Sequence, residues 1–191
     1  TTIQDSYDSS IFIKESIDEV YRTLVISMAL VVLVIYLFLG NIRATLVPAV
    51  TVPVALVGSF MFLLAMGYSI NLLTLLALVL AIGLVVDDAI VMLENIHRRI
   101  ELGEPPLLAA FRGAREVGFA IIATTLVLIA VFVPLVFMDG RIGALFTEFA
   151  MAVSAAVFFS SITALTLSPA LCSKVLKSSE KESKFSQWMD R

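Results

Sequence analysis

The sequence predicts an all-α fold, a multi-pass transmembrane helical bundle with five spans, and three observations lead to this prediction. First, 60% of the 191 residues are hydrophobic, only 15% are charged, and the mean hydropathy is +1.01, whereas soluble domains are about half apolar and about a quarter charged. Second, the sequence contains four long runs of residues without any charged side chain. Third, these runs would be apolar on every face of a helix, whereas the strands of a membrane barrel alternate between apolar and polar residues. A conventional soluble enzyme and a disordered segment are both excluded.

The lengths of the uncharged runs give the number of spans. Runs of 20, 43, 22 and 25 residues cover positions 23–42, 44–86, 117–138 and 149–173. A bilayer core about 30 Å thick needs about 20 helical residues, so three runs each predict one span. The longest run predicts two spans, because Gly67-Tyr68-Ser69-Ile70-Asn71 near its middle has the composition of a turn. We expect helices over approximately 23–39, 45–66, 71–93, 117–137 and 148–171.

The segments outside these spans divide the chain into three parts. Residues 1–22 are expected to end a region outside the membrane, with an amphipathic helix leading into the first span. The membrane region covers 23–173 and includes a polar stretch in which proline predicts a short cytoplasmic surface helix over about 105–116. Residues 174–191 form a mixed-charge tail. The chain begins Thr-Thr, which suggests an excerpt of a longer protein.

The basic residues predict the orientation. If the spans alternate, ten of the 13 lysines and arginines fall on one side of the membrane and three fall on the other. Cytoplasmic loops carry the excess of lysine and arginine. The N-terminus is therefore expected outside the cytoplasm and the C-terminus inside it.

Other composition signals limit the partners. No basic stripe with interleaved aromatic residues suggests nucleic acid. His97 has no second histidine or cysteine near it in the sequence, so no metal site is expected. No cofactor is expected beyond protons as the coupling ion.

Asp87 and Asp88 are the strongest candidate functional residues, because they are adjacent acids within the third predicted span. One charge at such a depth costs about 2.5–3.5 kcal/mol on insertion scales, and acids placed there are functional by default. Burial and a neighbouring acid both raise the pKa of a carboxyl group, and a nearby cation lowers it, so such a pair can load and release protons. The simpler alternative is a pair that only hydrogen-bonds helices together.

Weaker candidates surround this pair. Glu94 follows Asp87 by two helical turns and is a weak candidate for a proton exit, although an interfacial charge explains it more simply. Glu148 is expected to open the last span, where an acid suits the helix dipole. The apolar interiors of the spans contain no lysine, arginine or histidine, so the cationic partner of the acids is expected on helices outside this chain. Several hydroxyl residues could extend a proton path or simply bond within the bundle: Thr124, Thr125, Ser154, Ser160, Ser161 and Thr163.

The motif Val86-Asp87-Asp88-Ala89-Ile90-Val91, followed by Glu94-Asn95, resembles the fourth transmembrane helix of resistance–nodulation–division (RND) efflux transporters of the acriflavine-resistance, AcrB-type branch. Phe132-Val133-Pro134 and Leu167-Ser168-Pro169-Ala170-Leu171-Cys172 resemble the ends of the fifth and sixth helices of that family. The resemblance covers essentially the whole chain. It implies that the five spans are helices two to six of a twelve-helix transporter.

The resemblance also implies a function. Members of the family are secondary active transporters of the bacterial inner membrane rather than enzymes, and they exchange protons for hydrophobic and amphiphilic compounds. They are homotrimers that work with a periplasmic adaptor and an outer-membrane channel. Asp87 and Asp88 match the paired relay aspartates of the family, whose relay lysine lies on a helix absent here.

Two other classes are weighed against this one. An intramembrane aspartyl protease needs acids on two facing helices, but these two are neighbours on one helix, and the sequence has no Gly-x-Gly-Asp. A non-drug member of the same superfamily, concerned with protein export or with sterols and lipids, or a membrane scaffold fragment, stays open as the alternative.

Overall fold

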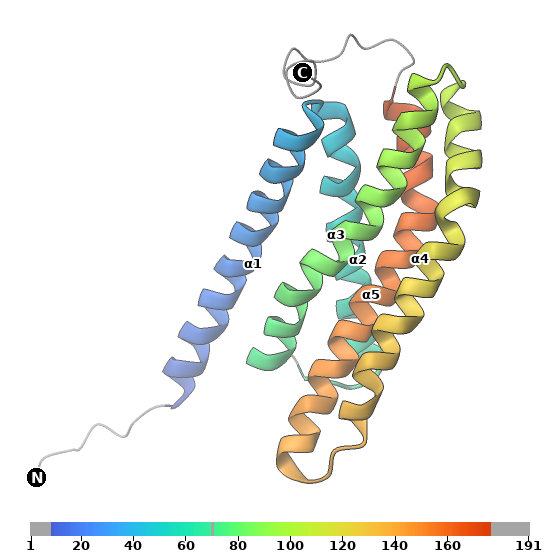
Figure 1. Cartoon of the computed structure of the whole chain (residues 1–191). Helices are drawn as coiled ribbons and strands as arrows, with labels where there is room; N and C mark the ends of the chain where they lie inside the picture. The colour runs from blue at the N-terminus through green and yellow to red at the C-terminus, as the bar shows by residue number, and fades with distance from the viewer. Residues whose placement is uncertain (1–8, 70, 177–191) are drawn as a thin grey trace, which may run out of the picture.

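The computed structural model describes residues 9–69 and 71–176, and this part of the chain folds into five long helices (Figure 1). They are α1 (Ser9–Leu39), α2 (Ile42–Ala65), α3 (Leu72–Glu101), α4 (Pro106–Val136) and α5 (Gly140–Val175). Each is long and apolar enough to cross a membrane. The predicted all-α fold with five spans is therefore confirmed.

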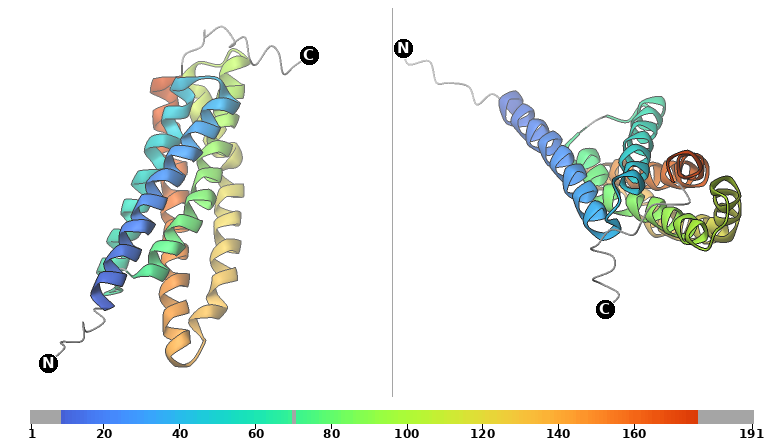
Figure 2. Two further views of the ribbon diagram at one scale, coloured as in Figure 1. Left: turned by 90° about the vertical axis from the view of Figure 1, so that its left-hand side faces the viewer. Right: turned by 90° about the horizontal axis from the view of Figure 1, so that it is seen from above.

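The helices run alternately up and down, so consecutive helices are antiparallel (Figure 1). The α1–α2 and α3–α4 turns and the end of α5 lie at one end of the bundle, which we call the Arg-rich end because Arg98, Arg99, Arg112 and Arg115 lie there. The α2–α3 and α4–α5 turns lie at the opposite end. Helix α5 packs against α2, α3 and α4, while α1 lies at the edge against α2 and α3 (Figure 2).

Small side chains allow close packing between the helices. Ala81 of α3 and Ala156 of α5 are fully buried in one shared cluster with Ala55 of α2. Further clusters lie toward either end, one around Met92 and Ile96 and the other around Ala77, Ala152 and Val153. Because lipid is as apolar as leucine, close packing of small residues is a main source of helix association in a bilayer.

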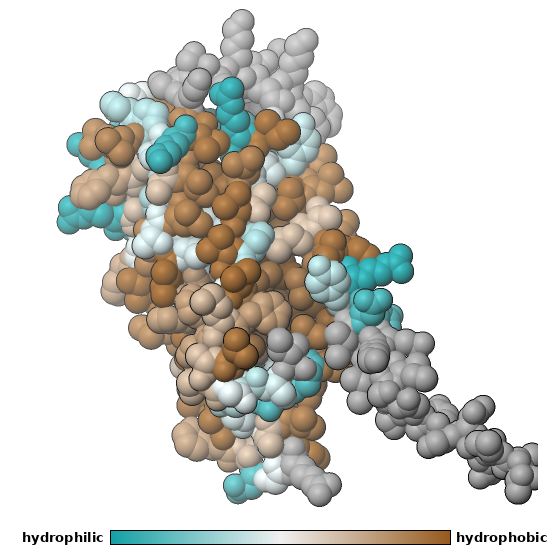
Figure 3. Space-filling view, turned by 180° about the vertical axis from the view of Figure 1, so that it is seen from behind, coloured by the Kyte–Doolittle hydropathy of each residue, from teal (hydrophilic) through white to brown (hydrophobic). Residues whose placement is uncertain are grey.

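On the face seen in Figure 3, hydrophobic residues cover most of the middle of the bundle, and hydrophilic residues lie at its ends and in one group at its side. Exposed large hydrophobic residues occur on all five helices. This distribution matches a protein whose solvent is the lipid hydrocarbon.

Three helices begin well before the predicted spans. Helix α1 starts at Ser9 and runs without a break into the first predicted span. Residues 106–116 are not a separate surface helix, because they form the first turns of α4. Helix α5 begins at Gly140, two turns before the predicted start. The prediction used the limits of uncharged runs, but a helix can extend beyond them where its polar side chains find partners. The N-terminal residues 1–8 and the tail residues 177–191 lie outside the described residues.

Candidate proton-coupling site

Asp87 and Asp88 lie in the central turns of α3. This helix starts with a capping box, in which the Asn71 side chain accepts from the Thr74 backbone N–H and the Thr74 hydroxyl accepts from the Asn71 N–H. Adjacent residues of a helix point about 100° apart, and the two acids accordingly have different surroundings. Asp88 is half-buried and points toward α5, whereas Asp87 is exposed.

The Ser160 hydroxyl of α5 holds Asp88. Its Oγ lies 2.8 Å from Oδ2 of Asp88 and 3.1 Å from the backbone oxygen of Val85. Ser160 is only 1% exposed, so this contact is screened from the surroundings. A hydroxyl has one proton to donate and can also accept. It can therefore donate to an ionised Asp88, or accept from a protonated Asp88 while donating to the Val85 carbonyl.

Asp87 lies on a face of α3 that no described residue covers. The exposed positions of this face repeat at intervals of three and four residues and include Leu76, Leu80, Gly83, Asp87, Val91 and Glu94. No heavy atom of a neighbouring element lies within 4 Å of a Cβ built on Gly83. Among the described residues, Asp87 has no hydrogen-bond or ion-pair partner. We call this surface the open face of α3.

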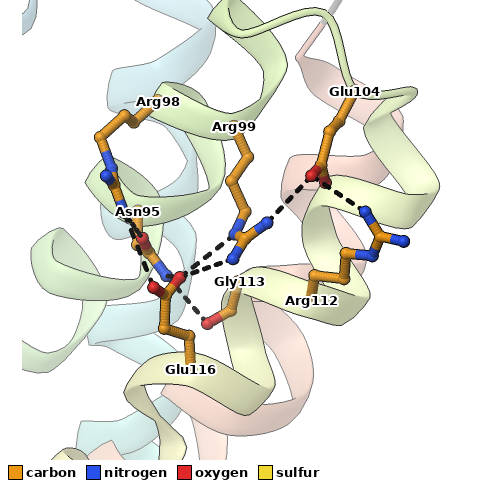
Figure 4. Close-up of polar contacts among 7 residues, drawn as sticks. All are labelled: Asn95, Arg98, Arg99, Glu104, Arg112, Gly113 and Glu116. Carbon is orange, nitrogen blue, oxygen red and sulfur yellow. Dashed lines mark hydrogen bonds and ion pairs between the residues drawn. The ribbon is translucent and has the colours of Figure 1, made fainter.

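A network of ionic and polar side chains joins α3 to α4 at the Arg-rich end, and we call it the α3–α4 clamp (Figure 4). Asn95 is buried, and its amide donates to the Gly113 carbonyl at 3.1 Å and to Glu116 at 3.0 Å. Arg99 donates to Glu116 at 2.9 Å and to Glu104 at 3.0 Å. Two further arginines complete the clamp. Arg98 donates a hydrogen bond to Asn95 at 2.9 Å, and Arg112 donates one to Glu104 at 3.1 Å.

Glu148 of α5 forms hydrogen bonds at the N-terminal end of α3, opposite the end where the clamp lies. It was expected to open the last span, but α5 starts at Gly140, so Glu148 lies two turns inside the helix and does not act on its dipole. Its carboxylate instead accepts hydrogen bonds from the Asn71 amide and the Ser69 hydroxyl. Helix α3 is thus bonded to α5 at its start and middle and to α4 at its end.

The weaker candidate residues from the sequence differ in the contacts that their side chains make. Glu94 is exposed on the open face and takes no part in the clamp. His97 contacts Glu101 at 3.1 Å on its own helix. Four of the remaining hydroxyl residues bond to carbonyls of their own helix: Thr124, Thr125, Ser161 and Thr163. In the part of the chain that is described, Ser160 alone among these hydroxyl candidates hydrogen-bonds to an acid.

Sequence reasoning did not find the clamp or the Glu148 contact. The prediction ended the third span before Asn95 and placed Glu116 at the end of a separate surface helix, although the apolar residues around Asn95 at helical spacing indicated that α3 continues. The Asn71–Glu148 contact joins residues 77 positions apart, and no local pattern points to it.

Five apolar helices with an acid pair in the central one define a segment of a multi-pass membrane protein. The chain belongs to the AcrB/AcrD/AcrF family, whose family model matches residues 1–191. It is 52% identical to multidrug resistance protein MdtC of Yersinia enterocolitica over 170 residues and 52% identical to MdtC of Citrobacter koseri over 178 residues. These matches cover 89% and 93% of this chain.

The coverage of the relatives is much smaller. The chain spans 17% of the length of both of these MdtC proteins, and likewise 17% of MdtC of Yersinia pseudotuberculosis, to which it is 51% identical over 174 residues.

Proposed function

We propose that this chain is part of the proton-translocating membrane domain of a drug/proton antiporter that exports hydrophobic and amphiphilic compounds. The observation that carries the proposal is the pair of acids Asp87 and Asp88 inside an apolar bundle. Asp88 is hydrogen-bonded to the Ser160 hydroxyl, and Asp87 lies on the open face of α3. The names of the relatives, multidrug resistance proteins, support the drug-export part of the proposal.

Each acid has its own role in this proposal. Asp88 exchanges a proton while remaining bonded to Ser160, because the hydroxyl serves both protonation states. Asp87 faces the position of a cation that other helices of the complete transporter supply, since a charge on a lipid-facing surface is costly without one. Glu94 lies on the same face nearer the Arg-rich end and is a weak candidate for the proton exit.

For the complete protein we propose secondary active transport, with no enzymatic step, no metal and no cofactor beyond protons. It would be a homotrimer of the bacterial inner membrane, surrounded by lipid and joined to a periplasmic adaptor and an outer-membrane channel. The remaining transporter helices, including one with a relay lysine, are then the direct partners of the open face.

The decisive experiment substitutes each acid in the full-length transporter. Asparagine keeps the shape of a protonated aspartate but cannot release a proton. Asp87→Asn and Asp88→Asn should each abolish dye efflux and drug resistance while trimer content stays near normal, because a neutral amide is less costly than a charge in the membrane. Glu94→Gln is the matched control and should retain most of the activity, since that side chain lies nearer the end of the span. Wild-type efflux by either aspartate variant would refute a two-acid relay.

The proposed orientation has a separate test. The ten-to-three asymmetry of basic residues supports an N-terminus in the periplasm and a C-terminus in the cytoplasm. Single cysteines at positions 69 and 140, in a background without Cys172, should react with a membrane-impermeant maleimide from the periplasm. Cysteines at positions 42 and 103 should react only after the membrane is opened. Labelling of position 103 from the periplasm would contradict the proposed topology.

A further inference from the structure

The outward face of α4 carries an arginine in the middle of an apolar stripe. The stripe comprises exposed side chains spaced by three or four residues: Leu107, Phe111, Arg115, Phe119, Ile122 and Leu126. At about 100° per residue these positions fall within an arc of about 120°. Phe119 is 83% exposed and Phe111 is 62% exposed, so Arg115 has an uncovered aromatic ring one turn away on either side.

Arg115 differs from the arginines of the α3–α4 clamp. Arg98, Arg99 and Arg112 each contact Glu104 or Glu116 within ion-pairing distance. No carboxylate of the described residues makes such a contact with Arg115, whose Cζ lies 5.7 Å from the centre of the Phe111 ring. Each arginine of the clamp is therefore paired with one of its two glutamates, whereas Arg115 keeps an unpaired positive charge among the described residues.

The place of Arg115 along α4 matches the boundary of the hydrocarbon. The uncharged run of this helix begins at Val117, two residues after Arg115. Phe119 and the apolar residues that follow it lie at acyl-chain depth. The guanidinium, on its long side chain, can reach the level of the headgroups from this position.

We propose that Arg115, with Phe111 and Phe119, forms a binding site for the headgroup phosphate of an anionic phospholipid. A guanidinium donates two parallel hydrogen bonds to phosphate oxygens, and the adjacent ring holds its plane by a cation–π contact. The acyl chains would lie along Phe119, Ile122 and Leu126. A lipid fits this surface better than a soluble anion, because the charge is continuous with an exposed apolar stripe. The inference does not depend on the proton relay.

The test places a fluorescent reporter next to the site in the full-length transporter. Phe119 is replaced by tryptophan in a background whose other tryptophans are phenylalanine. The protein is reconstituted into vesicles of phosphatidylcholine mixed with phosphatidylglycerol, one of which has brominated chains that quench tryptophan. Quenching gives the relative binding of the two lipids at this position. Phosphatidylglycerol should be preferred about fivefold, the ratio that corresponds to about 1 kcal/mol per arginine near an anionic headgroup layer.

Two substitutions that each remove one positive charge distinguish a specific lipid site from a surface that is merely basic. Arg115→Gln should reduce the preference to about one. Arg112→Gln, three residues away on the same helix, should leave it near fivefold, because Arg112 is bonded to Glu104. An equal loss in both variants, or an unchanged preference in Arg115→Gln, would overturn the site. Absence of quenching by either lipid would show that protein covers this face and would also overturn it.

Discussion

The Arg-rich end and the centre of the bundle both contain acidic residues of α3, α4 or the turn between them, yet their electrostatic environments differ. At the Arg-rich end, Glu104 and Glu116 are matched by arginines and by the buried Asn95 within the chain. At the centre, Asp88 has one hydroxyl, and Asp87 has no partner among the described residues. In the first region both carboxylates are paired with arginines of the chain, and in the second neither acid has a cation among the described residues.

Under the proposed function, this difference separates acids with a structural role from acids with a coupling role. A carboxylate that is paired inside its own chain stabilises the position of two helices and has no reason to change its charge. An acid left open in an apolar surface is expensive, and it is tolerated where another part of the protein supplies a partner or where its proton must come and go. The clamp thus fixes the end of α3, while the middle of the same helix remains available for coupling.

The clamp gives the largest expected effect on stability. Asn95→Ala removes the amide that bonds to Gly113 and Glu116, and hydrogen bonds to charged groups contribute about 1.5–3 kcal/mol. The midpoint of denaturant-induced unfolding in detergent should fall accordingly. Glu94→Gln, one residue away but exposed, should leave the midpoint unchanged, and an equal fall in both variants would show that Asn95 is not special.

Two glycines, one packed at the clamp and one on the open face of α3, allow the same comparison through smaller changes in stability. A Cβ on Gly113 would lie 2.8 Å from Cγ1 of Ile96, whereas a Cβ on Gly83 meets nothing within 4 Å. Gly113→Ala should therefore lower the stability of the 191-residue chain by about 1 kcal/mol, because overpacking of about 1–3 kcal/mol exceeds the gain in helix propensity of about 1 kcal/mol.

Gly83→Ala keeps the propensity gain without the clash. Its unfolding midpoint in the same detergent assay should equal or slightly exceed that of the unsubstituted chain. If both alanine variants lost stability equally, the open face of α3 would not be open in this chain.

The sequence was sufficient for the number and type of helices and for the acid pair. Uncharged runs and bilayer thickness are enough to count spans, and two adjacent aspartates directly after such a run, with apolar residues on their other side, are conspicuous. The helix ends were harder, because the prediction stopped α3 near position 93 although it continues to Glu101. Charge marks where a helix leaves the apolar layer and does not mark where it ends.

The partners of the acids could not be predicted from the sequence. Ser160 was one of six hydroxyl candidates, and only the packing of α5 on α3 brings it to Asp88. Glu148 was assigned to a helix start because its own neighbours suggested nothing else, but its contacts come from the distant α2–α3 turn. Contacts between helices depend on rotation and register, and apolar surfaces of similar composition leave both undetermined in the sequence.

Infrared difference spectroscopy of the full-length transporter between acidic and alkaline pH tests most directly whether the two central acids exchange protons. The carboxyl signal should weaken in Asp87→Asn and again in Asp88→Asn, because each substitution removes one group that changes protonation. Ser160→Ala should shift the part of the signal that Asp88→Asn removes and leave the rest in place, since its hydroxyl bonds to Asp88. Spectra in which neither asparagine variant alters the carboxyl signal would contradict the proton-relay role of this pair.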